Sequence, residues 1–412
     1  MLPAGSPLSA WLSWLETLSP REIDLGLERV HKVLGRLDIE YPEHVLTIAG
    51  TNGKGSSVAM AAALLSAAGW RVGAYTSPHI VAYNERIAVG GRPADDETIV
   101  AAFETIEAVR DEVPLTYFEY GTLAALVVFA HAGLDAWLLE VGMGGRLDAV
   151  NAIEPTAVLI TNVSLDHCDW LGEDVETIAA EKAGVMRPGV PVVFGDTDVP
   201  AAILRHARAI GARLLLRERD FPVDGVPVPG LAGEFQLGNA AAVLALLDAA
   251  GLGAATEPEL VARVLPAVDL PGRGQRIQRD GIEWLFDVAH NPAAAGMLAH
   301  TLAVDAGERR TIAIVAMLDD KDVDGFARAL DEHVDLWIAT TASGARALPA
   351  GELARRVANV TGRPCLIADA HRDALQVAEK EAATGDRIVV TGSFYLVGPV
   401  LQRLGLYSPR RS

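Results

Sequence analysis

The stretch Val45-Leu46-Thr47-Ile48-Ala49-Gly50-Thr51-Asn52-Gly53-Lys54-Gly55-Ser56-Ser57 decides the fold of this chain. Apolar and β-branched residues run into three glycines that enclose a lysine, and a helical pattern follows at 58–65. We therefore predict a strand, a phosphate-binding loop and a helix. Glycines let backbone N–H groups converge on an anion, the helix N-terminus adds a positive dipole end, and Lys54 adds a charge. A nucleoside triphosphate is the expected ligand.

This loop departs from the common pattern G-x-x-x-x-G-K-S/T, because Gly55 stands between Lys54 and the hydroxyl of Ser56. We interpret it as a variant phosphate loop. The alternative is a glycine-rich strand-to-helix turn with an incidental lysine. A dinucleotide-binding fold agrees less well, because Gly50, Gly53 and Gly55 do not have G-x-G-x-x-G spacing.

Length and composition limit the class of protein. The chain has 412 residues, more than the ~250–300 at which a single core stops growing, so we predict two domains. A net charge of −19 argues against a nucleic-acid-binding surface. Cys168 and Cys365 are far apart, which excludes a disulfide framework or zinc ribbon. With no signal peptide or membrane-spanning run, we expect a cytoplasmic protein with no nucleic-acid or membrane partner.

Polar side chains stand at the ends of three further predicted strands: Ser77, Glu140 and His167. The carboxyl ends of parallel strands are where α/β sheets bind ligands, and P-loop enzymes place there the acid that holds Mg²⁺. Three oxygen or imidazole donors at this edge predict a Mg²⁺ site. The alternatives are a capping role for Ser77 and a structural role for His167.

The pattern of strands and helices restarts in the last third of the chain. The segment 270–275, Leu-Pro-Gly-Arg-Gly-Gln, has the composition of a connection between domains. Apolar strand patterns at 284–288, 311–317, 336–340, 366–368 and 387–391 then alternate with helical patterns. We predict an α/β protein with a P-loop ATPase domain of mostly parallel sheet at 1–270 and a smaller Rossmann-like α/β domain at 271–412.

Other segments allow more than one interpretation. The aromatic segment 115–121, which precedes a helical pattern at 122–131, is either core or a stacking wall for a flat ligand. The glycine-rich loop 142–151 is a candidate for wrapping a substrate. Asn239 is either the N-cap of an alanine-rich helix or a contact to a nucleotide base. Lys182 lies in the last turn of a predicted helix, where it would complement the helix dipole.

Together these motifs resemble the folylpolyglutamate synthase/dihydrofolate synthase family of Mur-ligase-like amide ligases, and the resemblance covers most of the chain. The residues that carry it are 50–56, 76–79, 115–120, 139–148, 165–167, 181–184, 271–273 and 286–292. The inserted Gly55 is a feature of this family. Gly274 is a departure, because the family pattern suggests a bulkier residue after Arg273.

The resemblance implies a role for specific residues. The ATP-binding residues would be Thr51, Asn52, Gly53, Lys54, Gly55, Ser56, Asn239, Arg273 and Asp287. The metal ligands would be Ser77, Glu140 and His167. The pterin-bearing substrate would contact Ile23, Asp24, Leu25, Thr116, Tyr117, Phe118, Glu119, Leu147, Asp148 and Ala149. Lys54 and His290 would be catalytic, and Lys182 would be a carbamylated catalytic lysine near the metals.

The implied reaction is ATP-dependent ligation of L-glutamate to dihydropteroate and to tetrahydrofolates, through an acyl phosphate, with two Mg²⁺ and release of ADP and phosphate. ATP would phosphorylate the substrate carboxylate, and the amine of glutamate would then displace phosphate. We expect a monomer that acts on these small molecules alone. The alternatives are a monofunctional folylpolyglutamate synthase, a Mur-type ligase, a P-loop kinase acting on another acceptor, and a nucleotide-binding regulatory module without turnover.

Overall fold

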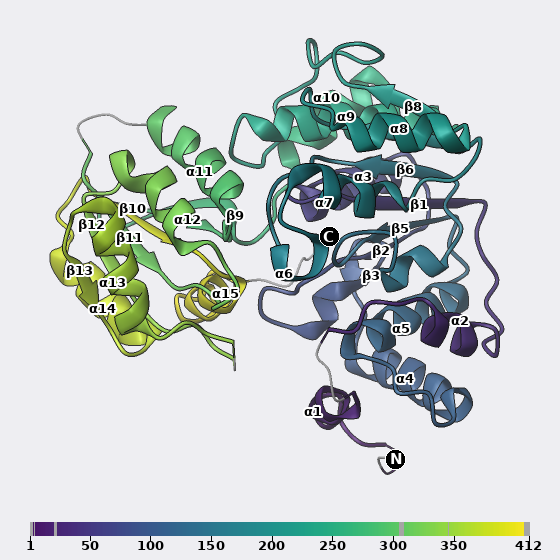
Figure 1. The fold of residues 1–412 in the computed structure, drawn as a ribbon, viewed down its shortest axis with the longest axis horizontal. Coiled ribbons are helices and arrows are strands. Elements are labelled where there is room, and N and C mark those ends of the chain that lie inside the picture. The colour runs from purple at the N-terminus through teal and green to yellow at the C-terminus, as the bar shows by residue number, and fades with distance from the viewer. Residues whose placement is uncertain (1–2, 4, 20–22, 305–308, 345, 408–412) are drawn as a thin grey trace.

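The computed structural model describes residues 3, 5–19, 23–304, 309–344 and 346–407. The described chain forms two lobes, each built on its own sheet, which lie side by side in Figure 1. The first lobe is coloured purple to teal and the second green to yellow. Two mostly parallel sheets covered by helices confirm the predicted α/β fold class.

The described part of the N-terminal lobe forms a sheet of eight strands in the order β4-β3-β2-β5-β1-β6-β7-β8. Its strands are β1 (His44–Ala49), β2 (Val72–Tyr75), β3 (Ile87–Val89), β4 (Arg92–Pro93), β5 (Ala136–Glu140), β6 (Ala157–Ile160), β7 (Pro191–Phe194) and β8 (Arg213–Leu216). The strands from β2 to β8 in this order run parallel, whereas β3 and β4 form an antiparallel edge. β1 is therefore an interior strand.

Strand β1 is apolar on both sides because helices cover both faces of the sheet. Leu46 and Ile48 belong to one core, and Val45 and Ala49 belong to the other. All four are at most 2% exposed. Parallel strands buried on both faces have near-continuous apolar sequences, which is the pattern that identified β1.

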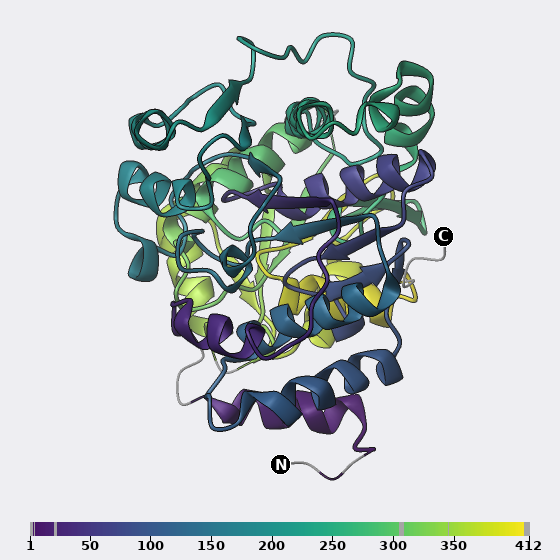
Figure 2. The same ribbon diagram turned by 90° about the vertical axis from the view of Figure 1, so that its right-hand side faces the viewer.

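Two layers of helices enclose this sheet. The face of Leu46 is covered by α3 (Lys54–Ala67), α9 (Phe235–Ala249) and α10 (Pro258–Val264). The opposite face is covered by α5 (Tyr117–Ala132), α7 (Val175–Ala183) and α8 (Ala201–Ile210), and α4 (Asp96–Arg110) packs against α5. α1 (Leu8–Leu18) and α2 (Glu28–Leu34) extend this second core, and Figure 2 shows α1 beside α4. The connections contain α6 (Cys168–Leu171), η1 (Tyr83–Arg86), η2 (Ala149–Ala152), η3 (Gly253–Thr256) and η4 (Leu265–Ala267).

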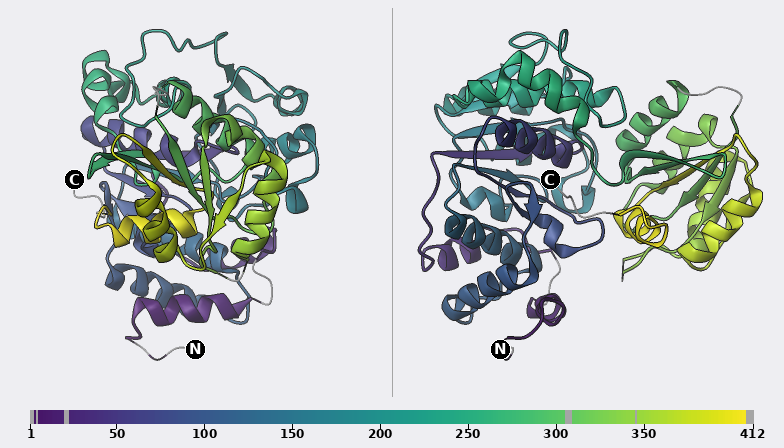
Figure 3. Two further views of the ribbon diagram at one scale, coloured as in Figure 1. Left: turned by 90° about the vertical axis from the view of Figure 1, so that its left-hand side faces the viewer. Right: turned by 180° about the vertical axis from the view of Figure 1, so that it is seen from behind.

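Among the described residues, the C-terminal sheet has six strands in the order β13-β12-β11-β14-β10-β9, and of these only β9 at one edge is antiparallel to its neighbour. The strands are β9 (Arg273–Arg279), β10 (Ile282–Asp287), β11 (Thr311–Val315), β12 (Leu336–Ala339), β13 (Cys365–Ile367) and β14 (Arg387–Thr391). One face packs against α11 (Pro292–Val304), α12 (Val323–Leu330) and α13 (Ala350–Thr361), with η5 (Asp331–His333) between α12 and β12. The other packs against α14 (His371–Glu381) and α15 (Phe394–Arg403). Figure 3 shows this sheet between its helices.

Three expectations about elements were wrong. The aromatic segment 115–121 is not a separate segment before a helix, because α5 begins at Tyr117 with Thr116 as its N-cap. Asn239 is not an N-cap, because α9 begins at Phe235 and Asn239 lies inside it. Part of the predicted connection at 270–275 is strand β9, whose pairing with β10 holds Arg273 opposite Asp287.

The two lobes touch at several points along their boundary. The Tyr407 hydroxyl donates to Glu85 Oε1 at 2.7 Å, and His300 Nε2 lies 2.6 Å from Glu234 Oε2. Ile80 packs against α15, where a Cβ on Gly398 would overlap the Ile80 carbonyl oxygen. In the part of the chain that the structure describes, no helix is long and apolar enough to cross a membrane.

Candidate active site

The phosphate loop connects β1 to α3 in a shape that only glycine permits. Gly50 has φ of +140°, and a Cβ there would overlap the side chain of Thr161 at the end of β6. Thr161 Oγ1 donates to the Asn52 carbonyl at 2.7 Å, and Asn162 Oδ1 accepts from Asn52 N at 3.0 Å. Residues that follow the neighbouring strand β6 therefore fix the backbone conformation of the loop at the carboxyl edge of the sheet. This position agrees with the predicted order of strand, loop and helix.

Two lysines converge on the carbonyl oxygen of Gly50. Lys54 Nζ donates to Gly50 O at 3.0 Å and to Thr51 O at 3.1 Å, and Lys182 Nζ donates to Gly50 O at 3.0 Å. Burial lowers the pKa of Lys54. Burial, helped by the charge of Lys54, lowers the pKa of Lys182 to about 7. Lys182 thus points into the site instead of complementing a helix dipole at the surface.

The three predicted metal ligands line one cavity of about 220 Å³ beside the loop: Ser77, Glu140 and His167. Ser77 N donates to Glu140 Oε2 at 3.1 Å, and Glu140 is 2% exposed. His167 has φ of +52°, and its buried Nδ1 has no hydrogen-bond partner among the described residues. Burial lowers the pKa of His167 to about 4, so its imidazole is neutral at pH 7.

These side chains fit a hard divalent cation. An unpartnered nitrogen of a neutral imidazole and a buried carboxylate are donors that such a cation accepts. Among the described residues, no group of three or more His, Cys, Asp or Glu side chains is arranged to hold a metal. A cation here would therefore need the Ser77 hydroxyl, and oxygens from bound ligands, in addition to Glu140 and His167.

A smaller cavity of about 40 Å³ adjoins the loop and is lined by both lobes. The N-terminal lobe contributes Asn52, Gly53 and Ser56, and the C-terminal lobe contributes Arg273, Asp287 and His290. Gln236, which sequence reasoning missed, donates to Ser56 Oγ at 3.1 Å. Asn239 lies behind the loop, donates to Gln236 at 3.0 Å, and leaves no room for a Cβ on Gly53.

The Asp287 carboxylate organises the start of the C-terminal lobe. It accepts from Gly274 N at 2.9 Å and from Ala289 N at 2.8 Å. The Arg273 guanidinium lies 4.9 Å from the ring centroid of Phe394. Gly274 has φ of +64°, and a Cβ there would lie 2.5 Å from Ala232 Cβ. In this chain, therefore, neither the backbone conformation at 274 nor the neighbouring Ala232 leaves room for the bulkier residue that the family pattern suggests.

The three predicted substrate segments lie close together on the α5 side of the N-terminal sheet. Arg29 Nη1 lies 3.0 Å from Asp24 Oδ2, and Arg29 Nη2 lies 2.9 Å from Glu119 Oε1. Gly26 N donates to Leu147 O at 3.2 Å. The backbone at 23–26 is therefore joined both to the start of α5 and to the loop at 147–149. Arg29 is the group that connects Asp24 to Glu119.

The aromatic segment contributes to this region as well as to the core. Phe118 packs against Gly142, and Arg86 lies 5.6 Å from the ring centroid of Tyr117. Asp148 is 3% exposed and accepts from Met143 N at 2.8 Å and from Val150 N at 3.0 Å. Burial raises the pKa of Asp148 to about 6. None of the ten predicted substrate residues lines the 220 Å³ cavity, whose wall on this side is 142–144.

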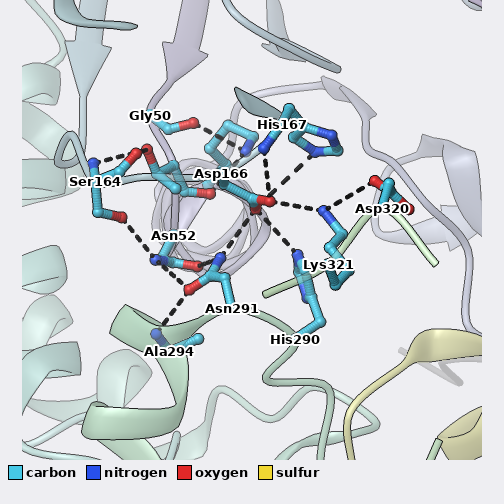
Figure 4. Close-up of polar contacts among 12 residues, drawn as sticks. Gly50, Asn52, Ser164, Asp166, His167, His290, Asn291, Ala294, Asp320 and Lys321 are labelled. Carbon is cyan, nitrogen blue, oxygen red and sulfur yellow. Dashed lines mark hydrogen bonds and ion pairs between the residues drawn. The ribbon is translucent and has the colours of Figure 1, made fainter. Parts of the chain in front are cut away.

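Sequence reasoning did not assign Asp166, Asn291 or Lys321 to the site, yet they join the two lobes there (Figure 4). Asp166 Oδ1 lies 2.6 Å from Lys321 Nζ, and Asp166 Oδ2 accepts from Asn291 Nδ2 at 2.9 Å. His290 Nε2 is 3.4 Å from the same oxygen. Burial alone would raise the pKa of Asp166, but its neighbours His290 and Lys321 hold it well below its usual range. The signal for Asp166 was its position after a buried strand.

Comparison with known proteins agrees with this geometry. The family model described as the Mur ligase middle domain matches residues 48–213, and that of the Mur ligase glutamate ligase domain matches residues 272–394. The chain is thus a Mur-type ligase in its fold and site, an ATP-dependent amide ligase.

Within that class the chain belongs to the dihydrofolate synthase/folylpolyglutamate synthase family. It is 39% identical to the Escherichia coli protein of that name over 97% of this chain and 96% of the relative, and 33% identical to the Mycobacterium tuberculosis protein over 94% and 88%. The structure of E. coli FolC in complex with DHPP and ADP superposes with a TM-score of 0.92, at 37% identity, covering 98% and 99% of the two chains. A structure of bifunctional folylpolyglutamate synthase/dihydrofolate synthase with Mn, AMPPNP and L-glutamate bound gives a TM-score of 0.91 at 40% identity, covering 98% of this chain and 100% of that chain.

Proposed function

We propose that this protein ligates L-glutamate to dihydropteroate and to tetrahydrofolates, using ATP and an acyl-phosphate intermediate. The observation that carries the proposal is the cavity at the lobe boundary. Lys54 on the phosphate loop lines it together with Glu140 and His167 from the same sheet edge and His290 from the other lobe. A carboxylate, an ATP γ-phosphate and an amine need to meet in such a space.

Each lobe has its own part in this proposal. Residues 1–270 would bind ATP and the pterin substrate, and residues 271–412 would bind glutamate and complete the nucleotide pocket. The ATP contacts would be Thr51, Asn52, Gly53, Lys54, Gly55, Ser56, Asn239, Arg273 and Asp287. The pterin contacts would be Ile23, Asp24, Leu25, Thr116, Tyr117, Phe118, Glu119, Leu147, Asp148 and Ala149. The protein would act as a monomer.

The residues of this chain account for most of the required charge compensation. Lys54 would leave the carbonyls of Gly50 and Thr51 for the phosphates of ATP, since its Nζ already lies at the mouth of the loop. His290 would stabilise negative charge on the transferring phosphate. The boundary between the lobes would exclude water, which would otherwise hydrolyse an acyl phosphate.

Ser77, Glu140 and His167 would hold Mg²⁺, with two ions in the complete site. Bound Mg²⁺ would neutralise charge on the phosphates of ATP. We further propose that Lys182 is carbamylated. Carbamylation requires a neutral amine, and a buried lysine with a pKa of about 7 supplies one at neutral pH. The modified side chain would add a negative charge near the metal ligands.

The test is an ADP-release assay with dihydropteroate or tetrahydrofolate as acceptor, each with and without L-glutamate. The proposal expects ADP release with both acceptors that depends on glutamate. Activity with tetrahydrofolate alone would identify a monofunctional folylpolyglutamate synthase. ADP release that needs no amino acid would indicate a kinase, and inactivity with both acceptors would point to another Mur-type substrate or to a binding module.

A further inference from the structure

Asp166 is the point at which the N-terminal lobe holds the reactive groups of the C-terminal lobe. It lies in the loop after β6, and four donors surround its carboxylate. Oδ1 accepts from Lys321 Nζ at 2.6 Å and from the backbone N of His167 at 2.9 Å. Oδ2 accepts from Asn291 Nδ2 at 2.9 Å and faces His290 Nε2 at 3.4 Å. Three of these four donors belong to the other lobe.

This arrangement requires a carboxylate. The side chains of Asp166 and Lys321 are 7% and 6% exposed, so the ion pair is buried. Removing one partner of a buried pair leaves the other charge unpaired, which costs more than the pair itself contributes. An amide at 166 has the same shape but only one acceptor oxygen, and its NH₂ group would face a donor on Asn291 or Lys321.

The same cluster is connected to the phosphate loop. Asn291 Nδ2 also lies 3.1 Å from Asn52 Oδ1, and Asn291 Oδ1 accepts from Ala294 N at 2.8 Å in the first turn of α11. Figure 4 shows Asn291 between Asn52 and Asp166. Asn291 therefore contacts both the phosphate loop and Asp166. The position of the C-terminal lobe and the conformation of the phosphate loop consequently depend on each other.

We propose that Asp166 is a positioning residue, whose carboxylate holds Lys321, Asn291 and His290 over the phosphate loop so that phosphate transfer and amide formation occur in one closed site. This inference rests on the proposed ligase function. Asp166 and its partners Lys321 and His290 all line the 220 Å³ cavity, so a shift of the anchor moves groups that face the reacting atoms. A displacement of about 1 Å in such a site is sufficient to lower a rate roughly 100-fold.

The test compares Asp166→Asn, Lys321→Met and the double variant, in the full-length protein with ATP, dihydropteroate and glutamate. We expect Asp166→Asn to lower kcat about 100-fold or more, and the double variant to be no slower than the slower single variant, because both changes break one pair. A purely structural role would lower the melting temperature but leave kcat per folded molecule unchanged. Multiplicative losses, or a kcat within about threefold of wild type, would overturn the proposal.

Glu234→Gln is the matched control for Asp166→Asn, and Asn291→Asp is a second test of the same cluster. Glu234→Gln makes the same acid-to-amide change in the ion pair with His300, which also joins the two lobes but is solvent-exposed at both ends, so kcat should stay within about threefold. If Asp166→Asn does not fold, Asn291→Asp places a second carboxylate against Asp166 and should lower kcat at least tenfold by repulsion; unchanged kcat in that variant also overturns the proposal. A wild-type protein without glutamate-dependent ADP release would instead refute the proposed function.

Discussion

Gly142→Ala should damage the pterin side of the site and leave the nucleotide side intact. Gly142 lies two residues after the end of β5, and a Cβ at this position would lie 2.7 and 2.9 Å from Cε2 and Cε1 of Phe118 and still closer to Cζ. Carbon atoms in contact prefer about 3.5–4.0 Å, so the ring has to move by roughly 1 Å. Tyr75, with its ring centroid 5.9 Å from that of Phe118, restricts the movement.

Overpacking of this kind costs about 1–3 kcal/mol of unfolding free energy. Because Phe118 is a proposed wall of the pterin site, its displacement should lower kcat/KM for dihydropteroate by about 10- to 100-fold. Gly142 also forms part of the wall of the 220 Å³ cavity beside the phosphate loop, but the added methyl group would point at the ring of Phe118, so the KM for ATP should stay within about twofold. Steady-state ADP release with each substrate varied in turn measures both quantities.

Gly296→Ala is the matched control for this change. Gly296 lies inside α11, and apart from its chain neighbours and the backbone of its own helix no heavy atom lies within 4 Å of the position that its Cβ would occupy. Alanine should therefore stabilise the helix by up to about 1 kcal/mol and leave kcat unchanged. If Gly142→Ala retains the wild-type kcat/KM for dihydropteroate while its stability falls as expected, Phe118 does not form the pterin wall.

Three other predictions follow from the same site. Lys54→Ala should abolish glutamate ligation with circular dichroism unchanged, because the loop loses its cation; retained turnover would refute the phosphate-loop assignment. Folding raises the pKa of Asp148 from 3.8 to about 6, so wild type loses stability as pH rises through this interval. As pH rises from about 4 to 7, the free energy of unfolding of Asp148→Asn should therefore increase by roughly 3 kcal/mol relative to that of wild type, as measured by denaturant titrations. The same pH dependence of unfolding free energy in both proteins would contradict this prediction. Because Lys182 has a pKa of about 7, its neutral fraction rises with pH through that value. Enzyme depleted of carbon dioxide should therefore lose ligation activity. Added bicarbonate should restore that activity more fully at pH 8 than at pH 6. Activity that does not respond to bicarbonate would argue against carbamylation.

Some elements that the sequence did not reveal had a visible signal, and others had none. Thr116 and Glu119 form a capping box at the start of α5, and their spacing in the sequence is the signature of a helix beginning there. Strand β9, in contrast, contains three arginines and two glutamines in seven residues. It is an edge strand in which apolar and polar residues alternate only weakly. It forms because its backbone pairs with that of β10, and no local sequence pattern predicts such a pairing.

The sequence by itself determined the phosphate loop, the parallel strands and the edge at which Glu140 and His167 stand. These features depend on local physical requirements: glycine where a Cβ would overlap Thr161, and continuous apolar runs where helices cover both faces of a sheet. Only the tertiary structure decided that Asp166 meets Lys321 and Asn291. A charged residue in an apolar segment predicts that its side chain has a polar partner, but the sequence does not identify that partner. Here the packing of the two lobes brings together side chains that lie more than a hundred positions apart in the sequence.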